Sequence, residues 1–198
     1  MKKYLIGVDE AGRGPLAGPV AVGVAKVPVD FDWSQIPGVN DSKKLKPETR
    51  EEIFKLATKL KKQGLIDYSV GMVAAKVIDK IGIVPSIKKA QERSFEKLVL
   101  EPKVCLVKLD GGLKASPEFV HQETIIKGDS KEKVIGLASI LAKVTRDRYM
   151  VRQAIKKNFL SYDFAKHKGY GTKAHREAIA KYGLSSIHRV SFCKNLQK

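Results

Sequence analysis

The sequence predicts an α/β fold, with a mixed five-stranded sheet flanked by helices and a C-terminal helical extension. Short apolar segments alternate with longer segments in which apolar residues recur every three or four positions. The first two short segments follow one another directly, whereas helical segments separate the later ones. This order favours a sheet with both antiparallel and parallel strands. The length of 198 residues and the hydrophobic content of 43% suit one main domain with its own core.

Five short apolar segments are expected to be strands: 4–9, 20–27, 67–73, 103–109 and 124–127. The first is a mostly apolar run, and the second is rich in valine and alanine. The third follows the glycine that ends the first helical segment. The fourth and fifth each lead into a turn that contains glycine, at Asp110-Gly111-Gly112 and Gly128-Asp129-Ser130.

Five segments with helical spacing of apolar residues are expected to be helices: 47–64, 74–80, 86–100, 132–157 and 172–182. The first begins at Pro47, which suits a first helical turn, and carries glutamates near its start. The longest is expected to be a core helix whose outer positions carry the basic residues Lys143, Arg146 and Arg148.

Three of the predicted strands end in acidic residues. Asp9 and Glu10 end the first, Asp110 ends the fourth and Asp129 follows the fifth. A single acid at such a place is more often a turn former. In open α/β sheets, however, functional sites gather at the carboxyl ends of strands. If these ends are neighbours, four carboxylates meet, and hard oxygen ligands suit two Mg²⁺ or Mn²⁺ ions.

The segment after the first strand adds a second feature. Adjacent carboxylates repel one another, so Asp9 and Glu10 favour a bound cation. Gly12-Arg13-Gly14 follows at once, where glycines let the backbone approach a partner and the guanidinium matches a phosphate. Metal ligands beside a phosphate contact indicate phosphodiester chemistry. The alternative is a strand that ends in a solvated acidic turn.

The charge distribution supports a polyanionic partner. The formal net charge is +17, and residues 1–40 are neutral, with four basic and four acidic residues. All of the excess therefore lies in the rest of the chain, which fits a metal site set in a phosphate-binding surface. Residues 161–198 alone hold eight Lys or Arg against two acids.

Other classes of protein are less compatible with the sequence. No run reaches the roughly 18 apolar residues of a membrane span, and we see no signal-peptide pattern. Cys105 and Cys193 lie far apart without metal-ligand spacing, so we expect reduced thiols in a cytoplasmic protein. The histidines of the tail do not have zinc-site spacing, and we expect them to hydrogen-bond locally or to contact phosphate.

Several motifs, in the right order along the chain, resemble the type 2 ribonuclease H (ribonuclease HII) family. They are Asp9-Glu10-Ala11-Gly12-Arg13-Gly14-Pro15, Asp41-Ser42-Lys43-Lys44-Leu45, Lys127-Gly128-Asp129-Ser130, the run from Ala138 to Asp147, the segment from His167 to Thr172, and the run from His188 to Phe192. The region after Asp110 matches less clearly. The resemblance implies a ribonuclease H-like fold, with a catalytic domain at 1–160 and an extension at 161–198 that contacts substrate.

The resemblance also implies an activity and a site. The activity is cleavage of RNA paired to DNA, and of DNA duplexes at embedded ribonucleotides, to give 3′-hydroxyl and 5′-phosphate ends. The four carboxylates named above would hold two Mg²⁺ or Mn²⁺ ions. Gly12, Arg13 and Gly14 would contact the 2′-hydroxyl and the adjoining phosphate, and Tyr170 would pack on the neighbouring sugar. Lys43 and Lys44 are candidate phosphate contacts, with a solvated charge run as the alternative.

Two other readings of the sequence stay open. Another nuclease of this fold is one, either a type 3 ribonuclease H, which should carry an extra N-terminal domain, or a DNA nuclease, which has no use for a 2′-hydroxyl contact. A non-enzymatic RNA-binding protein is the other, although aromatic residues make up only 7% of the chain. We expect a monomer, and the sequence leaves open whether a replication clamp is a partner.

Overall fold

The computed structural model describes residues 2–196, and its centre is a five-stranded sheet in the order β3-β2-β1-β4-β5. The strands are β1 (Tyr4–Ala11), β2 (Val20–Pro28), β3 (Asp67–Val73), β4 (Cys105–Asp110) and β5 (Gln122–Ile125). The pairs β1–β2 and β2–β3 are antiparallel, whereas β1–β4 and β4–β5 are parallel. The predicted mixed sheet is confirmed, and the carboxyl ends of β1, β4 and β5 lie at one edge.

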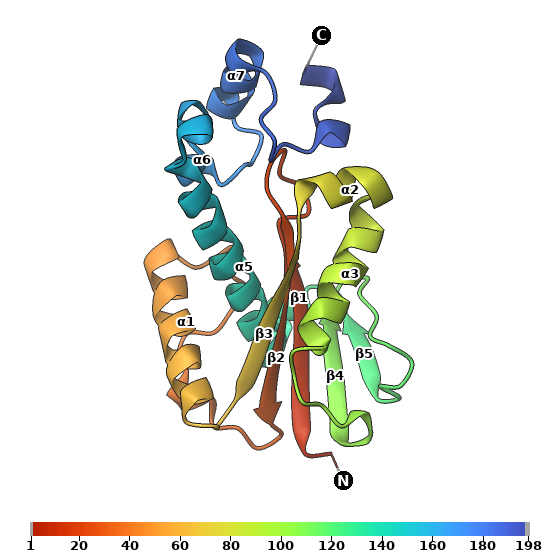
Figure 1. Cartoon of the computed structure of the whole chain (residues 1–198). Coiled ribbons are helices and arrows are strands. Elements are labelled where there is room, and N and C mark those ends of the chain that lie inside the picture. The colour runs from red at the N-terminus through yellow and green to blue at the C-terminus, as the bar shows by residue number, and fades with distance from the viewer. Residues whose placement is uncertain (1, 197–198) are drawn as a thin grey trace.

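Helices cover both faces of this sheet (Figure 1). They are α1 (Pro47–Lys62), α2 (Ala75–Ile81), α3 (Ile83–Phe95), α4 (Gly128–Lys131), α5 (Lys133–Ala154), α6 (Phe164–His167) and α7 (Lys173–Tyr182). Short 3-10 helices occur at η1 (Trp33–Gln35), η2 (Pro102–Val104), η3 (Lys157–Tyr162), η4 (Val190–Phe192) and η5 (Lys194–Leu196). Helices α1 and α5 lie on one face, and α2 and α3 lie on the other. Within residues 2–196, no helix has the length and apolar character needed to cross a bilayer.

Two of the expected helices differ from the observed ones by three or more residues at one or both ends. The helix expected at 86–100 begins three residues earlier and ends at Phe95, because Gly82, with φ of +83°, separates it from α2 by a single residue. The helix expected at 132–157 ends at Ala154. It is preceded by the separate turn of helix α4, which the sequence pattern did not predict.

The two faces of the sheet bury separate hydrophobic cores. Successive side chains of a strand point to opposite faces. Ile6 and Val8 of β1 pack in the core beneath α2 and α3, together with Val20, Val22 and Val24 of β2. The other core joins Ala25 and Val27 of β2 to the apolar faces of α1 and α5. Asp9 and Glu10 therefore leave β1 toward opposite faces.

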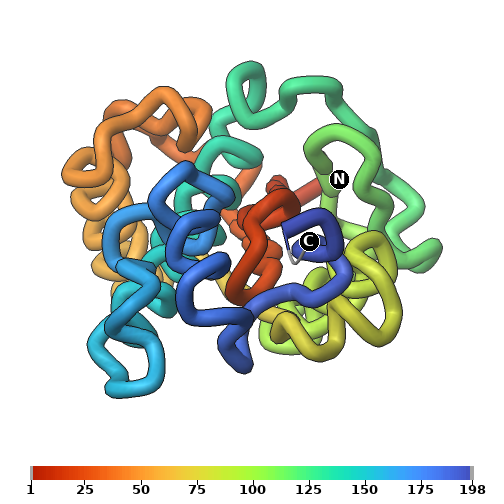
Figure 2. The backbone as a smooth tube through the Cα atoms, turned by 90° about the horizontal axis from the view of Figure 1, so that it is seen from above, coloured from red at the N-terminus to blue at the C-terminus, as the bar shows by residue number. Residues whose placement is uncertain are grey.

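The C-terminal segments pack on the second half of α5 and on the connection between β1 and β2. Figure 2 shows this connection, in red, beside the blue C-terminal trace. A third cluster of buried apolar residues joins Ala17, Met150, Tyr162 and Phe164. Ala17 also forms an isolated antiparallel bridge with His188. The connection between the two first strands is thus held by residues more than 120 positions later in the chain.

The backbone of helix α5 packs directly against the sheet at two strand residues that lack a side chain. A Cβ atom built on Gly7 of β1 would lie 2.1 Å from the carbonyl oxygen of Val134, and one on Gly23 of β2 would lie 2.3 Å from that of Ala138. Both contacts are with helix backbone, which cannot turn aside. Glycine at these two positions therefore sets the distance between α5 and the sheet.

We expect Gly7→Ala to lower the free energy of unfolding by about 1–3 kcal/mol, because the added methyl group forces α5 away from β1. Urea denaturation measures this. Gly112→Ala is the control, since a Cβ there meets no atom within 4 Å. The control should change stability by less than about 0.5 kcal/mol. Equal stability of the two variants would contradict the close packing described here.

Candidate active site

The four predicted carboxylates lie at the edge where the parallel strands end. Asp9 and Glu10 are the two residues before the last residue of β1, and Asp110 is the last residue of β4. Asp129, however, does not end a strand, so that part of the prediction is wrong. Strand β5 ends at Ile125, and Lys127 then adopts a left-handed conformation, with φ of +57°, that starts the short helix α4.

Helix α4 is tied to the end of β4 by one hydrogen bond. The backbone N–H of Gly128 donates to Oδ1 of Asp110 at 2.7 Å. Asp129, the next residue, is buried, with 5% of its surface exposed. This short contact places Asp129 near the end of β4 although no strand leads directly to it.

Asp9 is the most deeply buried of the four acids, with 3% of its surface exposed. Burial raises the pKa of its carboxyl to about 8, and the nearby carboxylates of Glu10 and Asp110 add to the rise. A hydrogen bond with Ser139 of α5 and the N–H of Glu10, 2.7 Å from Oδ1, act in the opposite direction. Asp9 is therefore a carboxyl group that needs a cation to hold its charge.

The pKa values of Glu10 and Asp129 are also raised by burial. Burial raises the pKa of Glu10, although the guanidinium of Arg13, 3.4 Å away, partly offsets it. Burial also raises the pKa of Asp129, and the carboxylate of Asp41 adds to this. Asp110 contributes to the rise at Asp9, Glu10 and Asp129 alike. These acids thus share one region of negative potential.

The side chains do not form a ready-made chelate. Among residues 2–196, no three His, Cys, Asp or Glu side chains lie close enough together to hold one ion as they stand. Each carboxylate instead has its own partner: the N–H of Glu10 for Asp9, Arg13 for Glu10, the N–H of Gly128 for Asp110, and Lys43 for Asp129. Their chemistry suits a hard divalent cation, and binding one requires these partners to be exchanged.

The loop at residues 41–44 meets this region through only one of its two lysines. Nζ of Lys43 lies 3.5 Å from Oδ2 of Asp129, so the ammonium group already occupies part of the acidic region. Nζ of Lys44 lies 4.0 Å from Oδ2 of Asp41 instead, and both lysine side chains are largely exposed. We assigned no role to Asp41 or Ser139 from the sequence, although both lie inside the motifs that resemble the family. Their residue types alone gave no signal of where they would lie.

The predicted phosphate-contacting segment turns outward next to the acids. Gly12 has φ of +86°, and a Cβ there would lie 2.1 Å from Nε of Arg146, so only glycine fits. Arg13 and Gly14 are exposed, and a Cβ on Gly14 would meet no atom within 4 Å. The structure therefore places this segment where a substrate could approach it.

Two fully buried arginines donate hydrogen bonds to backbone carbonyls of that segment and of the residues next to it. Arg146 of α5 donates to the carbonyl oxygens of Pro19, Ala17 and Lys168 at 2.9–3.1 Å. Arg189 donates to those of Gly18, Arg13 and Gly12 at 2.7–3.0 Å. Both are 0% exposed. The prediction that Arg146 is an outer basic position is therefore wrong, and Arg189 does not belong to a solvated basic surface either.

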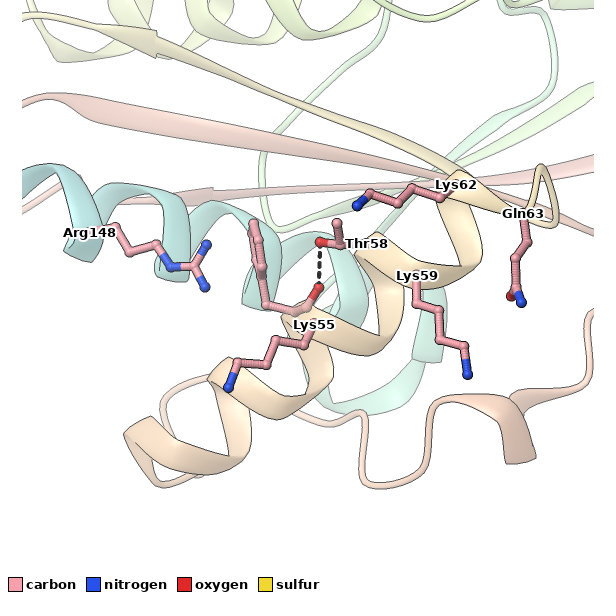
Figure 3. A pocket seen from close by; sticks show the side chains of 7 residues that line it. Lys55, Thr58, Lys59, Lys62, Gln63 and Arg148 are labelled. Atoms are coloured by element: carbon pink, nitrogen blue, oxygen red, sulfur yellow. Dashed lines mark hydrogen bonds between the residues drawn. The ribbon is translucent and has the colours of Figure 1, made fainter.

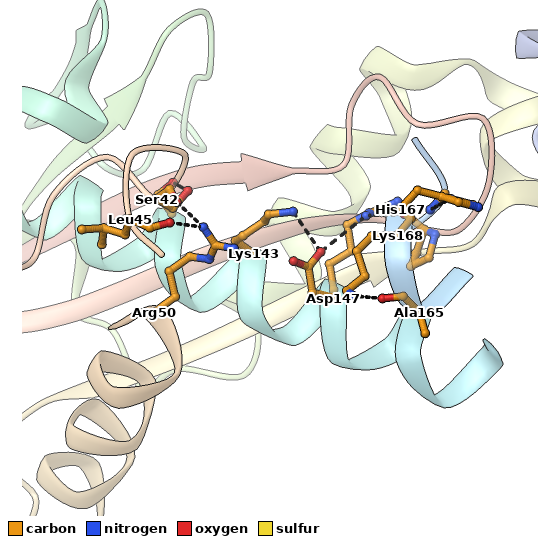
Figure 4. Close-up of polar contacts among 12 residues, drawn as sticks. Ser42, Leu45, Arg50, Lys143, Asp147, Ala165, His167 and Lys168 are labelled. Atoms are coloured by element: carbon orange, nitrogen blue, oxygen red, sulfur yellow. Dashed lines mark hydrogen bonds and ion pairs between the residues drawn. The ribbon is translucent and has the colours of Figure 1, made fainter. Parts of the chain in front are cut away.

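Figure 4 shows the outer side of this part of α5. Lys143 and Asp147 form an ion pair at 3.0 Å, one helical turn apart. Arg50 of α1 donates to the carbonyl oxygens of Ser42 and Leu45, which fastens the loop before α1. The loop that carries Lys43 is therefore anchored on both of its sides.

Tyr170 is half-exposed, and its loop is held by backbone hydrogen bonds. The backbone N–H groups of Leu16 and Ala17 both donate to the carbonyl of Gly169. The ring lies 5.2 Å from Nζ of Lys143 and 5.6 Å from Cζ of Arg146. Tyr170 is thus held beside the connection between β1 and β2, and 40% of its surface remains exposed.

A chain of neutral histidines fixes the backbone of Tyr170. Nδ1 of His175 donates to the carbonyl of Tyr170 at 2.9 Å, so its Nε2 accepts from Nε2 of His188 at 3.0 Å. Nδ1 of His188 in turn accepts from the N–H of Ser185. Burial lowers the pKa of both rings to about 4, which keeps them neutral. The expectation that the tail histidines hydrogen-bond locally is confirmed for these two.

A pocket of about 450 Å³ lies on α1, away from the acids (Figure 3). Its lining includes Lys55, Lys59 and Lys62 of α1 and Arg148 of α5. Arg148 is also paired with Glu51. The pocket holds positive charge but none of the four acids, so it is a separate basic surface.

The mixed sheet, the acids at the ends of neighbouring strands and the exposed basic loop together define a nuclease of the ribonuclease H fold. Comparison with known proteins identifies the branch. The sequence model of the family described as "Ribonuclease HII" matches residues 6–195. The chain therefore belongs to the ribonuclease HII family, as its motifs predicted.

Individual relatives agree. A ribonuclease HII of Caldicellulosiruptor bescii is 48% identical over 195 residues, which cover 98% of this chain and 88% of the relative. The crystal structure of ribonuclease H2 from Pyrococcus horikoshii OT3 aligns with 27% identity and a TM-score of 0.71, covering 98% and 97% of the two chains. Bst-RNase HIII in complex with Mn²⁺ shares the fold at 19% identity, with a TM-score of 0.68 and coverage of 98% and 69%.

The raised pKa of Asp9 leads to a pH-dependent prediction for the metal-free protein. The native carboxyl keeps its proton up to about pH 8, whereas the unfolded one loses it near 3.8. Asp9 therefore makes the wild type lose stability as pH rises from about 4 to about 8, and Asp9→Asn lacks this contribution. We expect the variant to be the more stable at pH 8 by at least ~1.4 kcal/mol, the equivalent of one pKa unit.

Urea denaturation in excess chelator at pH 5 and pH 8 measures this difference. The advantage of Asp9→Asn over the wild type should be larger at pH 8. An advantage that is the same at both values would show that the Asp9 carboxyl is not protonated in the folded protein.

Proposed function

We propose that this protein is a metal-dependent endoribonuclease that hydrolyses the RNA strand of RNA–DNA hybrids and cuts DNA duplexes at embedded ribonucleotides. The observation that carries the proposal is the position of four acids, Asp9 and Glu10 in β1, Asp110 at the end of β4 and Asp129 in α4, near the exposed residues Arg13 and Gly14, in a member of the ribonuclease HII family. The products would be 3′-hydroxyl and 5′-phosphate ends. We propose that it acts in the cytoplasm as a monomer.

The donor set fits two divalent cations. Asp9, Glu10, Asp110 and Asp129 would hold them, since buried carboxyl groups with raised pKa values are stabilised as anions by a cation. Bound Mg²⁺ or Mn²⁺ would supply Lewis-acid activation for hydrolysis of the phosphodiester. The ammonium of Lys43 already compensates Asp129 in part, which supports a cation at that position.

The remaining predicted residues would bind and orient the nucleic acid. Arg13 and the flanking glycines would contact the 2′-hydroxyl and the adjoining phosphate, because a 2′-hydroxyl both donates and accepts hydrogen bonds. The half-exposed ring of Tyr170 would pack on the neighbouring sugar. Lys43 would contact phosphate, and Lys44, which is largely exposed, would do so from the loop's outer side. The C-terminal extension would contact the duplex.

The decisive experiment is cleavage of a DNA duplex that contains one ribonucleotide, with an all-DNA duplex as the control. We expect a single cut at the ribonucleotide in Mg²⁺, none in excess chelator and none in the control. Asp9→Asn, Glu10→Gln, Asp110→Asn and Asp129→Asn should each lower turnover steeply while leaving the protein folded. Cleavage of the all-DNA duplex at the same rate as the duplex with one ribonucleotide, or full activity in chelator, would contradict the proposal.

Tyr170 should act through its ring rather than through charge or metal. We expect Tyr170→Ala to reduce cleavage at a single embedded ribonucleotide by about tenfold to a hundredfold, as expected for a stacking contact of roughly 1–3 kcal/mol. Tyr170→Phe should retain much of the activity. The Mg²⁺ concentration for half-maximal activity should not change in either variant. If Phe is as damaging as Ala, the hydroxyl matters and the stacking account fails.

A further inference from the structure

Arg189 makes contacts that neither charge pairing nor ordinary core packing explains. Its guanidinium is 0% exposed, and within residues 2–196 no carboxylate oxygen lies within 4.0 Å of it. All three of its nitrogen groups donate to backbone carbonyls of one short segment, at Gly18, Arg13 and Gly12. Two of these carbonyls belong to the segment proposed to contact substrate. Arg189 is 176 and 177 residues away from them in the sequence.

The geometry of the peptide bond transmits this contact to the opposite side of the loop. The peptide bonds of residues 2–196 are trans, so each C=O points away from the N–H of the following residue. When Arg189 holds the carbonyls of Gly12 and Arg13 inward, the N–H groups of Arg13 and Gly14 point outward. Within the described part of the chain, neither N–H group donates to another protein atom. Both residues are exposed.

The same guanidinium places positive charge directly behind these donors. Burial lowers the pKa of Arg189 to about 9, and the nearby Arg146 adds to this, yet the group stays charged at neutral pH. Two adjacent backbone N–H groups next to a buried cation favour binding of an anion or a hydroxyl oxygen. A lysine could not reproduce it, since an ammonium lacks the planar fork that spans several carbonyls.

We infer that Arg189 is a positioning residue, which turns the N–H groups of Arg13 and Gly14 toward the 2′-hydroxyl and adjoining phosphate of a ribonucleotide. This inference rests on the proposed function. Arg189 touches no substrate atom itself. It acts through the backbone of the loop, so its loss should reduce selectivity for a ribonucleotide more than it reduces general affinity for duplex.

The test compares Arg189→Lys with the wild type and with Arg93→Lys. Arg93 is a matched control, because it also donates to a backbone carbonyl, that of Met72, but on the exposed side of α3. Two quantities are measured at neutral pH: kcat and KM for a duplex with one ribonucleotide, and the inhibition constant of an all-DNA duplex as competitor. Melting temperature and half-saturating Mg²⁺ are followed in parallel.

We expect Arg189→Lys to lower kcat/KM about tenfold, the effect of losing one to two oriented hydrogen bonds. The inhibition constant of the all-DNA duplex should change less than twofold, half-saturating Mg²⁺ should not change, and Arg93→Lys should resemble the wild type. A parallel loss in both duplexes, or no loss in a folded variant, would overturn the inference. If the wild type itself does not cut at the ribonucleotide, the proposed function is wrong, and so is the inference that depends on it.

A second pair of variants keeps the test valid if Arg189→Lys does not fold. Gly14→Pro removes one of the two N–H donors at an exposed position, whereas Gly14→Ala adds a methyl group into open space and keeps the donor. The proline variant should show the selective loss of kcat/KM, and the alanine variant should show less of it. Equal losses in the two variants would show that the outward N–H of residue 14 is not what binds the ribonucleotide.

Discussion

The close approach of α5 to the sheet at Gly7 and Gly23 is the constraint on which the candidate active site depends. Residues 139, 143 and 146 are three or four positions apart and so lie on one face of this helix. Each of them contacts or lies near a different part of the site. Ser139 lowers the pKa of Asp9, Lys143 lies near the ring of Tyr170, and Arg146 holds the connection between β1 and β2. A side chain at either glycine would displace all three together, so the packing of the core and the geometry of the site are one requirement.

The site combines mutually repelling carboxylates with two buried arginines whose hydrogen bonds are satisfied. The buried carboxylates raise one another's pKa values and have only partial compensation from Lys43 and Arg13. The buried guanidinium of Arg146 and that of Arg189 find backbone acceptors for their donors, and no buried side-chain polar atom of the described residues lacks a partner. Such a rigid support lets a protein keep like charges close together, since those charges cannot relax by moving apart.

Local features of the sequence predicted the sheet and most of the acids. Apolar runs of β1 and β4 end where the acids begin, so Asp9, Glu10 and Asp110 could be placed at strand ends. Asp129 could not, because the left-handed turn at Lys127 that starts α4 has no sequence signature there. The burial of Arg146 was missed because its acceptors are backbone carbonyls. Every residue carries one, so no pattern of side chains indicates which arginine will find them.

The attachment of the loop after β1 to Arg189 also bears on how the protein is made. A chain that emerges from the ribosome can pair β1 with β2 early, since these strands are neighbours in sequence. The loop between them cannot acquire its final shape until residue 189 has been synthesised, 177 positions after Gly12. Contacts of such long sequence separation form late in folding. A nascent chain that already contains all four acids therefore still lacks the contact of Arg189 with the loop that we propose to contact the ribonucleotide.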